Sequence, residues 1–349
     1  MCDCVDEEFL EMDCNIHSWM SGSVHAAPWV PVPLTLSPHS LSRRGRRRLK
    51  LVTLVLGSSG FIGGRVVREL TRSGVETMSY DVIQSNLEGG DAKWIKADIM
   101  DPMTLERVFL EYGVDSVIHL IGYPDIAQCE KDPQLSFSLN VLSLQNTLEP
   151  MRKADVDHVM FASSAAVYGY DSPTPVPESS PLTPNTVYGF HKMIGEKLLQ
   201  AYAKSYGIRY TALRLFNVYG ANPVSGKDVI SIFIRRAMNN EPITLKGPGK
   251  FRDFVHVDDV AALITKLAVK DGESSTYNVG TGTRVTLQQI ADSVKKYFKD
   301  VRVAVEPVPD DGKGIVADTA ALKSAASVSF RPPLQGIDEH IRGYSKKGR

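Results

Sequence analysis

The sequence has few cysteines, no excess of charge of either sign and no long hydrophobic run, and each absence excludes a class of protein. Four cysteines in 349 residues, three of them within the first 14, cannot form a disulfide scaffold, so we expect a cytoplasmic, reducing location. Lys and Arg number 40, and so do Asp and Glu, which disfavours a nucleic-acid or membrane-surface binder. No apolar run reaches the roughly 18 residues of a membrane helix.

Residues 1–50 differ from the rest of the chain. Residues 1–42 carry six acidic residues and no Lys or Arg, whereas residues 43–50 carry six basic ones. Four prolines over residues 28–38 interrupt any helix or central strand. Since neither a helical nor a strand period is present, we expect a disordered or non-native N-terminal extension.

Sharper interpretations of this extension are less favoured. Its possible metal ligands match no closed zinc spacing; they are Cys2, Cys4, Cys14, His17 and His25. A secretory signal begins with basic residues and a transit peptide is poor in acids, whereas this segment begins with acids. The basic run is more typical of a solvated linker than of a nuclear or nucleic-acid patch. We expect no metal site.

From Leu51 the chain alternates between strand-like and helix-like segments. The apolar run 51–56 precedes a glycine-rich turn and a helical stretch, 65–72. Further strands are expected to end near residues 81, 97, 120, 162, 215 and 279, with further helices over 105–112, 135–152 and 188–206. This alternation predicts βαβ units and a parallel sheet.

Shorter elements follow residue 219. A helix is expected over 230–239, strands over 243–245 and 254–257, and a helix over 259–270 with Asp258 as its cap. They predict a smaller C-terminal lobe that is interleaved with the main sheet.

The turn after the first strand has the composition of a dinucleotide-binding loop. Gly57, Gly60 and Gly63 are spaced so that backbone N–H groups and a helix N-terminus could approach a pyrophosphate. Asp81 ends the next strand, where a carboxylate accepts hydrogen bonds from the ribose hydroxyls and repels a 2′-phosphate. No Arg follows it, so the pattern favours NAD over NADP.

A Ser, a Tyr and a Lys form a candidate catalytic set. Tyr188 and Lys192 lie four residues apart, on one face of a predicted helix. A nearby ammonium group lowers the pKa of a phenol, so we expect Tyr188 to act as a general base near neutral pH. Ser164 directly follows a strand, at the edge where open α/β sheets bind ligands.

The histidines and the absent hydrolase motif narrow the chemistry. His119 and His191 lie near this set, but a core or surface role is the favoured interpretation of both. Neither a G-x-S-x-G motif nor a Ser–His–Asp order is present, which disfavours a hydrolase.

Together these segments resemble the extended short-chain dehydrogenase/reductases, specifically the NAD-dependent epimerase/dehydratase family. The resemblance runs from about Leu51 to Ile341 through GSSGFIG, ADI, VIHLIG, SLNVLSLQNTL, FASSAAVYG, YGFHK, LRLFNVYG, FRDFVHVDDV, YNVGTG and VADTAAL. It implies a Rossmann-type, doubly wound parallel sheet over residues 51–220. It also implies a smaller α/β substrate-binding lobe over residues 221–345, partly interleaved with that sheet.

The resemblance also implies roles for individual residues. Ser164, Tyr188 and Lys192 would be catalytic, with Ser164 also touching substrate and the other two touching cofactor. Asn217 and Arg252 would bind the diphosphate of a nucleotide sugar. The remaining NAD-binding residues would be Gly57, Gly60, Phe61, Ile62, Gly63, Asp81, Asp98, Ile99, Leu120, Gly122 and Asn140.

The residues after Ser164 discriminate between reactions in this family. Related dehydratases and decarboxylases resemble Thr-Asp-Glu or Thr-Ser-Glu there, whereas Ala165 and Ala166 supply no acid. The resemblance therefore implies a homodimeric nucleotide-sugar 4-epimerase of the UDP-glucose/UDP-galactose type, working through a 4-keto sugar. The alternatives are an NAD-dependent oxidoreductase or reductase of the same family and a non-catalytic NAD-binding protein.

Two departures from the family pattern concern the diphosphate. Asp228 replaces a usual Asn, where its charge would face phosphate unfavourably. Residues 308–311 replace a usual Arg-Pro-Gly-Asp stretch, so that Lys313 would have to supply the missing positive charge.

Overall fold

The structure is a computed structural model that describes residues 51–84, 92–169, 172–221, 226, 228–270, 272–309 and 312–345. The N-terminal extension, and the metal-ligand interpretation of its Cys and His residues, lie outside the described residues. So do Asp310 and Asp311, which belong to one of the two departures noted above.

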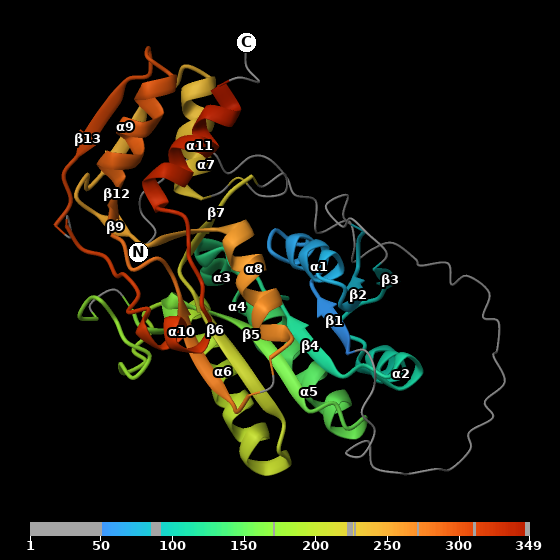
Figure 1. The fold of residues 1–349 in the computed structure, drawn as a ribbon. Coiled ribbons are helices and arrows are strands. Elements are labelled where there is room, and N and C mark those ends of the chain that lie inside the picture. Colours follow the sequence, from blue (N-terminus) through green and yellow to red (C-terminus); the bar gives the residue numbers. More distant parts are fainter. Residues whose placement is uncertain are drawn as a thin grey trace, which may run out of the picture. The chain divides into compact units, whose positions relative to one another are not determined.

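A seven-stranded parallel sheet lies at the centre of the described chain (Figure 1). Its strands, in spatial order, are β11 (Ser275–Val279), β6 (Arg209–Leu215), β5 (His158–Ser164), β4 (Ser116–His119), β1 (Val52–Leu56), β2 (Glu76–Asp81) and β3 (Lys93–Lys96). The order 3-2-1-4-5-6 is that of a Rossmann fold, to which β11 adds an edge strand. The predicted α/β class and parallel sheet are confirmed.

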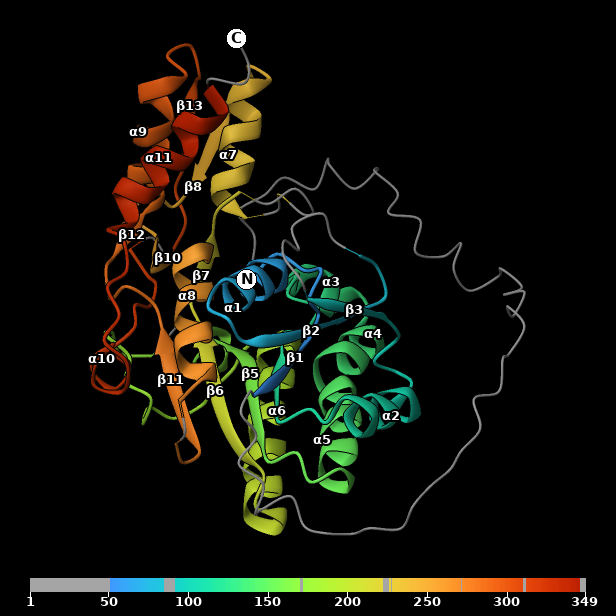
Figure 2. The ribbon, with the colours of Figure 1, turned by 45° about the vertical axis from the view of Figure 1, so that its right-hand side comes forward.

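Helices cover both faces of the sheet (Figures 1 and 2). One face packs against α1 (Gly63–Arg72), α8 (Val257–Ala268) and α10 (Ala320–Ala325). The other packs against α2 (Pro102–Tyr112), α5 (Ser143–Lys153) and α6 (Val187–Tyr206). Since both faces are buried, the strands consist of almost continuous apolar runs.

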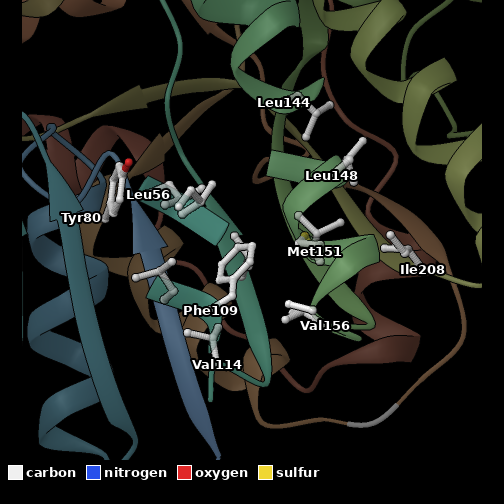
Figure 3. Close-up of a cluster of buried hydrophobic side chains, with 14 of the residues drawn as sticks. Leu56, Tyr80, Phe109, Val114, Leu144, Leu148, Met151, Val156 and Ile208 are labelled. Carbon is white, nitrogen blue, oxygen red and sulfur yellow. The ribbon is translucent and has the colours of Figure 1, made fainter. Parts of the chain in front are cut away.

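Alternate residues of β1 serve the two cores. Leu54 and Leu56 belong to the core shared with α2 and α5, whereas Val55 belongs to the core shared with α1 and α8. Figure 3 shows the first of these cores, in which Leu56 lies among side chains such as Phe109 and Leu144.

The helix expected over residues 135–152 is present, but a π-helical turn interrupts its regular α-helical hydrogen bonding. The structure has α3 (Ile126–Lys131), α4 (Pro133–Phe137), a π-helical turn (Ser138–Leu142) and then α5. Asp132 caps α4 by accepting a hydrogen bond from Leu135 N at 2.9 Å. The π-helical turn shifts the register between α4 and α5, and it carries Asn140.

The C-terminal elements form a third core. It packs α7 (Val229–Met238), α9 (Leu287–Tyr297) and α11 (Pro333–Ser345) around Ile230, Phe254 and Ile290. The strand pairs here are β7 (Asn217–Tyr219) with β10 (Phe254–His256), β9 (Phe251–Arg252) with β12 (Val285–Thr286), and β8 (Ile243–Lys246) with β13 (Val303–Glu306). β11 returns to the main sheet beside β6.

The cap of α8 differs from the prediction. α8 begins at Val257, so Asp258 lies inside its first turn, and the N-cap is His256, whose Nδ1 accepts from Asp258 N at 3.2 Å. Asp258 instead pairs with Arg65. None of the helices in the described ranges is long and apolar enough to cross a membrane.

Candidate active site

The sequence-predicted site residues come from the carboxyl ends of β1 to β5, from the π-helical turn and α6, and from β7 and β9. The loops after β1 and β4 leave the sheet toward opposite faces, since one leads to α1 and the other to α3. Such a switch in strand order opens a crevice at the carboxyl edge of a parallel sheet, where ligands bind.

The glycine loop joins β1 directly to α1. Gly57 has a φ of +78°, which L side chains rarely adopt. A Cβ on Gly63 would lie 2.0 Å from Gly57 O, so only glycine allows the turn to close. The N-cap of α1, Ile62, offers no capping side chain, and the first turn holds no acid. This helix start therefore suits an anion such as a pyrophosphate.

Asp81 is fixed against the glycine loop. Its Oδ2 accepts from Ser59 N at 3.0 Å and its Oδ1 from Val82 N at 2.8 Å. A carboxylate has about four acceptor positions, and Ile83 N takes a third one at 3.5 Å from Oδ1, so one position remains on Oδ2 for a hydroxyl donor. The carboxylate therefore fits the ribose of a dinucleotide.

Asp98 and Ile99 follow β3, beside the end of β2. Asp98 O accepts from the hydroxyl of Tyr80 at 3.0 Å. Ile99 is buried, and its carbonyl accepts from Asn146 Nδ2 at 3.1 Å. The two residues thus form a fixed, partly apolar wall on the side of Asp81.

The segment after β4 meets the π-helical turn and α6. Leu120 N donates to Leu56 O at 2.9 Å, which holds this segment beside β1. Asn140 accepts from Tyr123 N at 3.0 Å, and a Cβ on Gly122 would lie 2.9 Å from both Asn140 Oδ1 and Lys192 Nζ. A glycine at 122 thus leaves the Lys192 ammonium room at the sheet edge.

Ser164, Tyr188 and Lys192 lie close together, as expected from the spacing of Tyr188 and Lys192 and from the position of Ser164 after a strand. Thr186 caps α6 by accepting from Gly189 N at 3.1 Å, which places Tyr188 and Lys192 in its first two turns. Ser164 ends β5 and hydrogen-bonds the Tyr188 phenol. Lys192 Nζ donates to Ala162 O at 2.9 Å.

The expected pKa of Tyr188 is wrong for this structure. Burial raises the pKa of Tyr188 to about 12, and the hydrogen bond with Ser164 offsets this only in part. Burial also lowers the pKa of Lys192 to about 8. Because Lys192 Nζ lies 5.8 Å from the Tyr188 ring centroid and donates to Ala162 O, burial outweighs its charge.

The two histidines are core residues. His119 is fully buried against Phe161, with ring centroids 5.8 Å apart, and burial followed by the charge of Lys192 lowers its pKa to about 3. His191 Nδ1 lies 2.8 Å from Ser136 Oγ, and burial lowers its pKa also. Both rings are therefore neutral at pH 7.

Asn217 and Arg252 are brought together through Asp253. Asn217 Nδ2 donates to Asp253 O at 3.1 Å, and Arg252 immediately precedes Asp253. The Asp253 carboxylate is fully buried and accepts from Thr281 Oγ1 at 2.7 Å and Ala317 N at 3.0 Å. Burial raises its pKa, and these hydrogen bonds oppose the shift. Sequence reasoning missed Asp253, although it is the third residue of the FRDFVHVDDV segment.

The departure at Asp228 has a local structural role. Asp228 is the N-cap of α7, where its carboxylate accepts from Ser231 N at 3.0 Å and from Ser231 Oγ at 2.6 Å. The expectation of an unfavourable charge facing phosphate thus overlooked that the carboxylate is held by the helix start.

Comparison with known proteins decides the family. Residues 53–280 match the model of the NAD dependent epimerase/dehydratase family. The chain belongs to this family. It is accordingly an enzyme of the isomerase class, with NAD as its cofactor. The Gly63 turn, the uncapped start of α1 and Asp81 fit that cofactor.

Relatives and solved structures agree with the family assignment. The chain is 34% identical to a putative UDP-glucose 4-epimerase of Methanocaldococcus jannaschii, over 85% of this chain and 99% of that protein. UDP-glucose 4-epimerase of Thermotoga maritima, solved with UDP-glucose, superposes with a TM-score of 0.79 at 27% identity, covering 86% of this chain and all of that one. The Thermus thermophilus enzyme, solved with NAD, gives 0.71 at 29% identity, covering 84% and 99%.

Asp81→Ala is expected to weaken NAD binding and to remove the preference over NADP. The change deletes a charged acceptor for the ribose, so the Kd for NAD should rise about 10- to 100-fold. The Kd for NADP should rise less or fall, because the repulsion of a 2′-phosphate is also lost. Calorimetry with both dinucleotides measures this. Glu76→Ala, at the other end of β2, is the control, and an unchanged ratio of the two Kd values would contradict the role of Asp81.

Proposed function

We propose that this chain is a UDP-glucose 4-epimerase, which interconverts UDP-glucose and UDP-galactose by transient oxidation at C4 of the sugar. The observation that carries the proposal is the Ser164–Tyr188–Lys192 set, together with Ala165 and Ala166 directly after Ser164. Ser164 Oγ accepts from Ala166 N at 3.2 Å, and this turn carries no acid that could assist elimination of water. A reversible oxidation needs no such acid, and relatives over almost their full length carry the same name.

The glycine loop and the ends of the neighbouring strands would hold NAD. The loop and α1 would face the pyrophosphate, Asp81 would face the adenosine ribose, and Asp98 and Ile99 would face the adenine. Leu120, Gly122 and Asn140 would line the nicotinamide half, and Lys192 would donate to its ribose. When bound, NAD supplies the hydride acceptor and later the hydride donor.

Tyr188 is the proposed general acid and base. Its phenolate accepts the proton of the sugar 4-hydroxyl during oxidation, and the phenol returns it after the 4-keto sugar has turned over in the site. Ser164 hydrogen-bonds the same oxygen and orients it.

Lys192 is the group that we propose lowers the pKa of the Tyr188 phenol. Its pKa of about 8 keeps the ammonium mostly protonated at neutral pH, although it is buried. A phenol whose pKa is raised to about 12 by burial needs a neighbouring positive charge before it can act as a base. Movement of the ammonium from Ala162 O toward the phenol would supply that charge.

Asn217 and Arg252 are the proposed ligands of the UDP diphosphate. Arg252 Nη1 donates to Phe251 O at 2.8 Å, and a guanidinium has further donors. Arg is suited to diphosphate because its donors form a planar fork.

Conversion of UDP-glucose tests the proposed function. Purified protein should produce UDP-galactose on sugar-nucleotide chromatography without consuming added NAD. UDP-glucose deuterated at C4 should yield UDP-galactose that keeps the label, because the hydride stays within the site. Loss of the label or accumulation of free NADH would favour the oxidoreductase alternative, and no conversion at all would favour the non-catalytic one.

We further propose a cytoplasmic homodimer. Cys129 is a free, buried thiol, and it is the one cysteine within the described ranges, which suits a reducing compartment. Large apolar side chains are exposed along α4, the π-helical turn and α6; they are Phe137, Leu142, Phe190, Ile194 and Tyr206. Large apolar side chains exposed on neighbouring elements favour an interaction surface, and a second copy is the occupant we propose.

Phe190→Asp is therefore expected to convert a dimer into a monomer. Phe190 is 47% exposed and lies one turn before Ile194, so a charge there would be buried without a partner in the dimer. Light scattering at micromolar concentration measures the mass. Val305→Asp, at a 58% exposed position on β13, is the control. A Phe190→Asp protein of unchanged mass would place the interface elsewhere or exclude it.

A further inference from the structure

Arg65 is a buried arginine that contacts three separate segments. It lies in the first turn of α1, and its side chain is only 7% exposed. Its Nη1 donates to Phe61 O at 2.8 Å, and its Nε donates to Asp258 Oδ1 at 3.1 Å. Its Nη2 donates to Ala221 O, and the guanidinium carbon lies 5.0 Å from the centroid of the Phe61 ring.

The three segments belong to different parts of the site. Phe61 lies in the glycine loop, the proposed pyrophosphate site. Ala221 comes two residues after β7, the strand that begins with the proposed diphosphate ligand Asn217. Asp258 lies in the first turn of α8, directly after β10, and β10 pairs with β7. A single guanidinium thus joins the cofactor side of the site to the substrate side, and Figure 1 shows α1 and α8 packed next to each other.

The chemistry of arginine suits a residue that binds acceptors from three segments. A guanidinium presents five donors in a rigid plane and can bind three acceptors that lie in different directions. A Lys ammonium has three donors on one atom and would reach fewer of these partners. Burial lowers the pKa of Arg65, and Asp258 raises it only in part. The guanidinium is thus held where its desolvation costs free energy. A buried charged group of this kind can contribute to conformational specificity more than to stability.

We propose that Arg65 is a positioning residue of the epimerase reaction, which fixes the spacing between the glycine loop and the β7 segment and so between bound NAD and bound UDP-sugar. The proposal rests on the proposed function, because it assigns the two sides of the site to these two ligands. Arg65 itself touches neither reacting atom in this scheme.

Arg65→Met tests the proposal, because it keeps most of the apolar stem and deletes the donors. We expect kcat/KM for UDP-glucose to fall about 10- to 100-fold, because a misplacement of a reactant by about 1 Å can cost up to about 100-fold. The loss should appear mainly in KM and in the Kd of UDP-glucose for the NAD-loaded enzyme, with NAD affinity changed little. Arg65→Lys should restore part of the loss. Arg72→Met, in the last turn of the same helix at a 73% exposed position, should behave like the wild type.

Asp258→Ala provides a double-mutant cycle. If Arg65 acts through Asp258, the double variant should lose less kcat/KM than the product of the two single losses. A proportional loss of NAD affinity and melting temperature at unchanged kcat/KM of the NAD-saturated enzyme would show that Arg65 only supports the fold, and would overturn the proposal. So would an Arg65→Met enzyme with wild-type KM.

The failure of the two proposals can be told apart on the wild-type enzyme. If the wild type neither binds UDP-glucose calorimetrically nor converts it, the proposed function fails and the assignment of Arg65 falls with it. If the wild type does both and Arg65→Met equals it, only the assignment of Arg65 fails.

Discussion

Tyr188→Phe is expected to abolish epimerisation while NAD stays bound. The phenol is the one group in the proposed scheme that accepts and returns the sugar proton, and loss of a positioned general base lowers the rate about 10²–10⁴-fold. The glycine loop and Asp81, which provide most of the proposed cofactor contacts, remain unchanged. Measuring kcat by chromatography and the Kd for NAD by calorimetry separates the two effects.

Two further variants sharpen this test. Ser164→Ala should lower kcat less than Tyr188→Phe, because it removes an orienting hydrogen bond and leaves the base in place. Tyr206→Phe, at a 54% exposed position at the end of the same helix, should leave kcat unchanged. A Tyr188→Phe enzyme that keeps more than about a tenth of the wild-type kcat would exclude Tyr188 as the proton acceptor.

The central sheet could be predicted because its local and long-range signals agree. β1 is a continuous apolar run that ends at a turn of three spaced glycines, and both faces of the strand are buried. The same alternation of apolar strand and helix recurs from β3 to β6. In each unit the local pattern alone indicates a parallel sheet covered on both sides.

The segments around Asn140 could not be predicted in the same way. Apolar spacing over residues 135–152 is compatible with one helix, and it does not reveal the extra residue of a π-helical turn. α3 has only six residues, which is too few for a periodic signal. In the C-terminal lobe β8 pairs with β13, about 60 residues away, and no local signal specifies such a partner.

Some features of the site could likewise be predicted from the sequence, and others could not. The i, i+4 spacing of Tyr188 and Lys192, and the position of Ser164 after a strand, were enough to predict that these residues meet. Their pKa values were not predictable, because burial depends on the packing of α6 against the sheet. Asp258 was predicted as a cap, yet its carboxylate pairs with Arg65, 193 positions earlier in the chain.

Glu196 and Arg214 form a buried ion pair beneath the catalytic set, and sequence reasoning missed it. Arg214 Nη2 lies 2.7 Å from Glu196 Oε2, and the two side chains are 6% and 2% exposed. Ser163 Oγ donates to Glu196 at 2.6 Å, next to Ser164. Arg214 also donates to the Tyr168 hydroxyl at 2.7 Å. A charged residue at 214 within an apolar strand was the available signal, because a buried charge requires a partner.

Glu196→Ala is expected to destabilise the protein strongly, by about 3–5 kcal/mol in the free energy of unfolding. The substitution leaves the Arg214 guanidinium buried without its counter-charge and leaves Ser163 without its acceptor. Replacing both partners, as in Glu196→Leu/Arg214→Met, should cost less than the single change, because no unpaired charge remains. Urea denaturation of the three proteins measures these differences. Lys296→Ala, which breaks the exposed pair with Asp338, is the control and should change stability by no more than about 1 kcal/mol. A Glu196→Ala protein as stable as this control would show that the buried pair does not hold α6 against the sheet, and the position of Tyr188 and Lys192 would then depend on apolar packing alone.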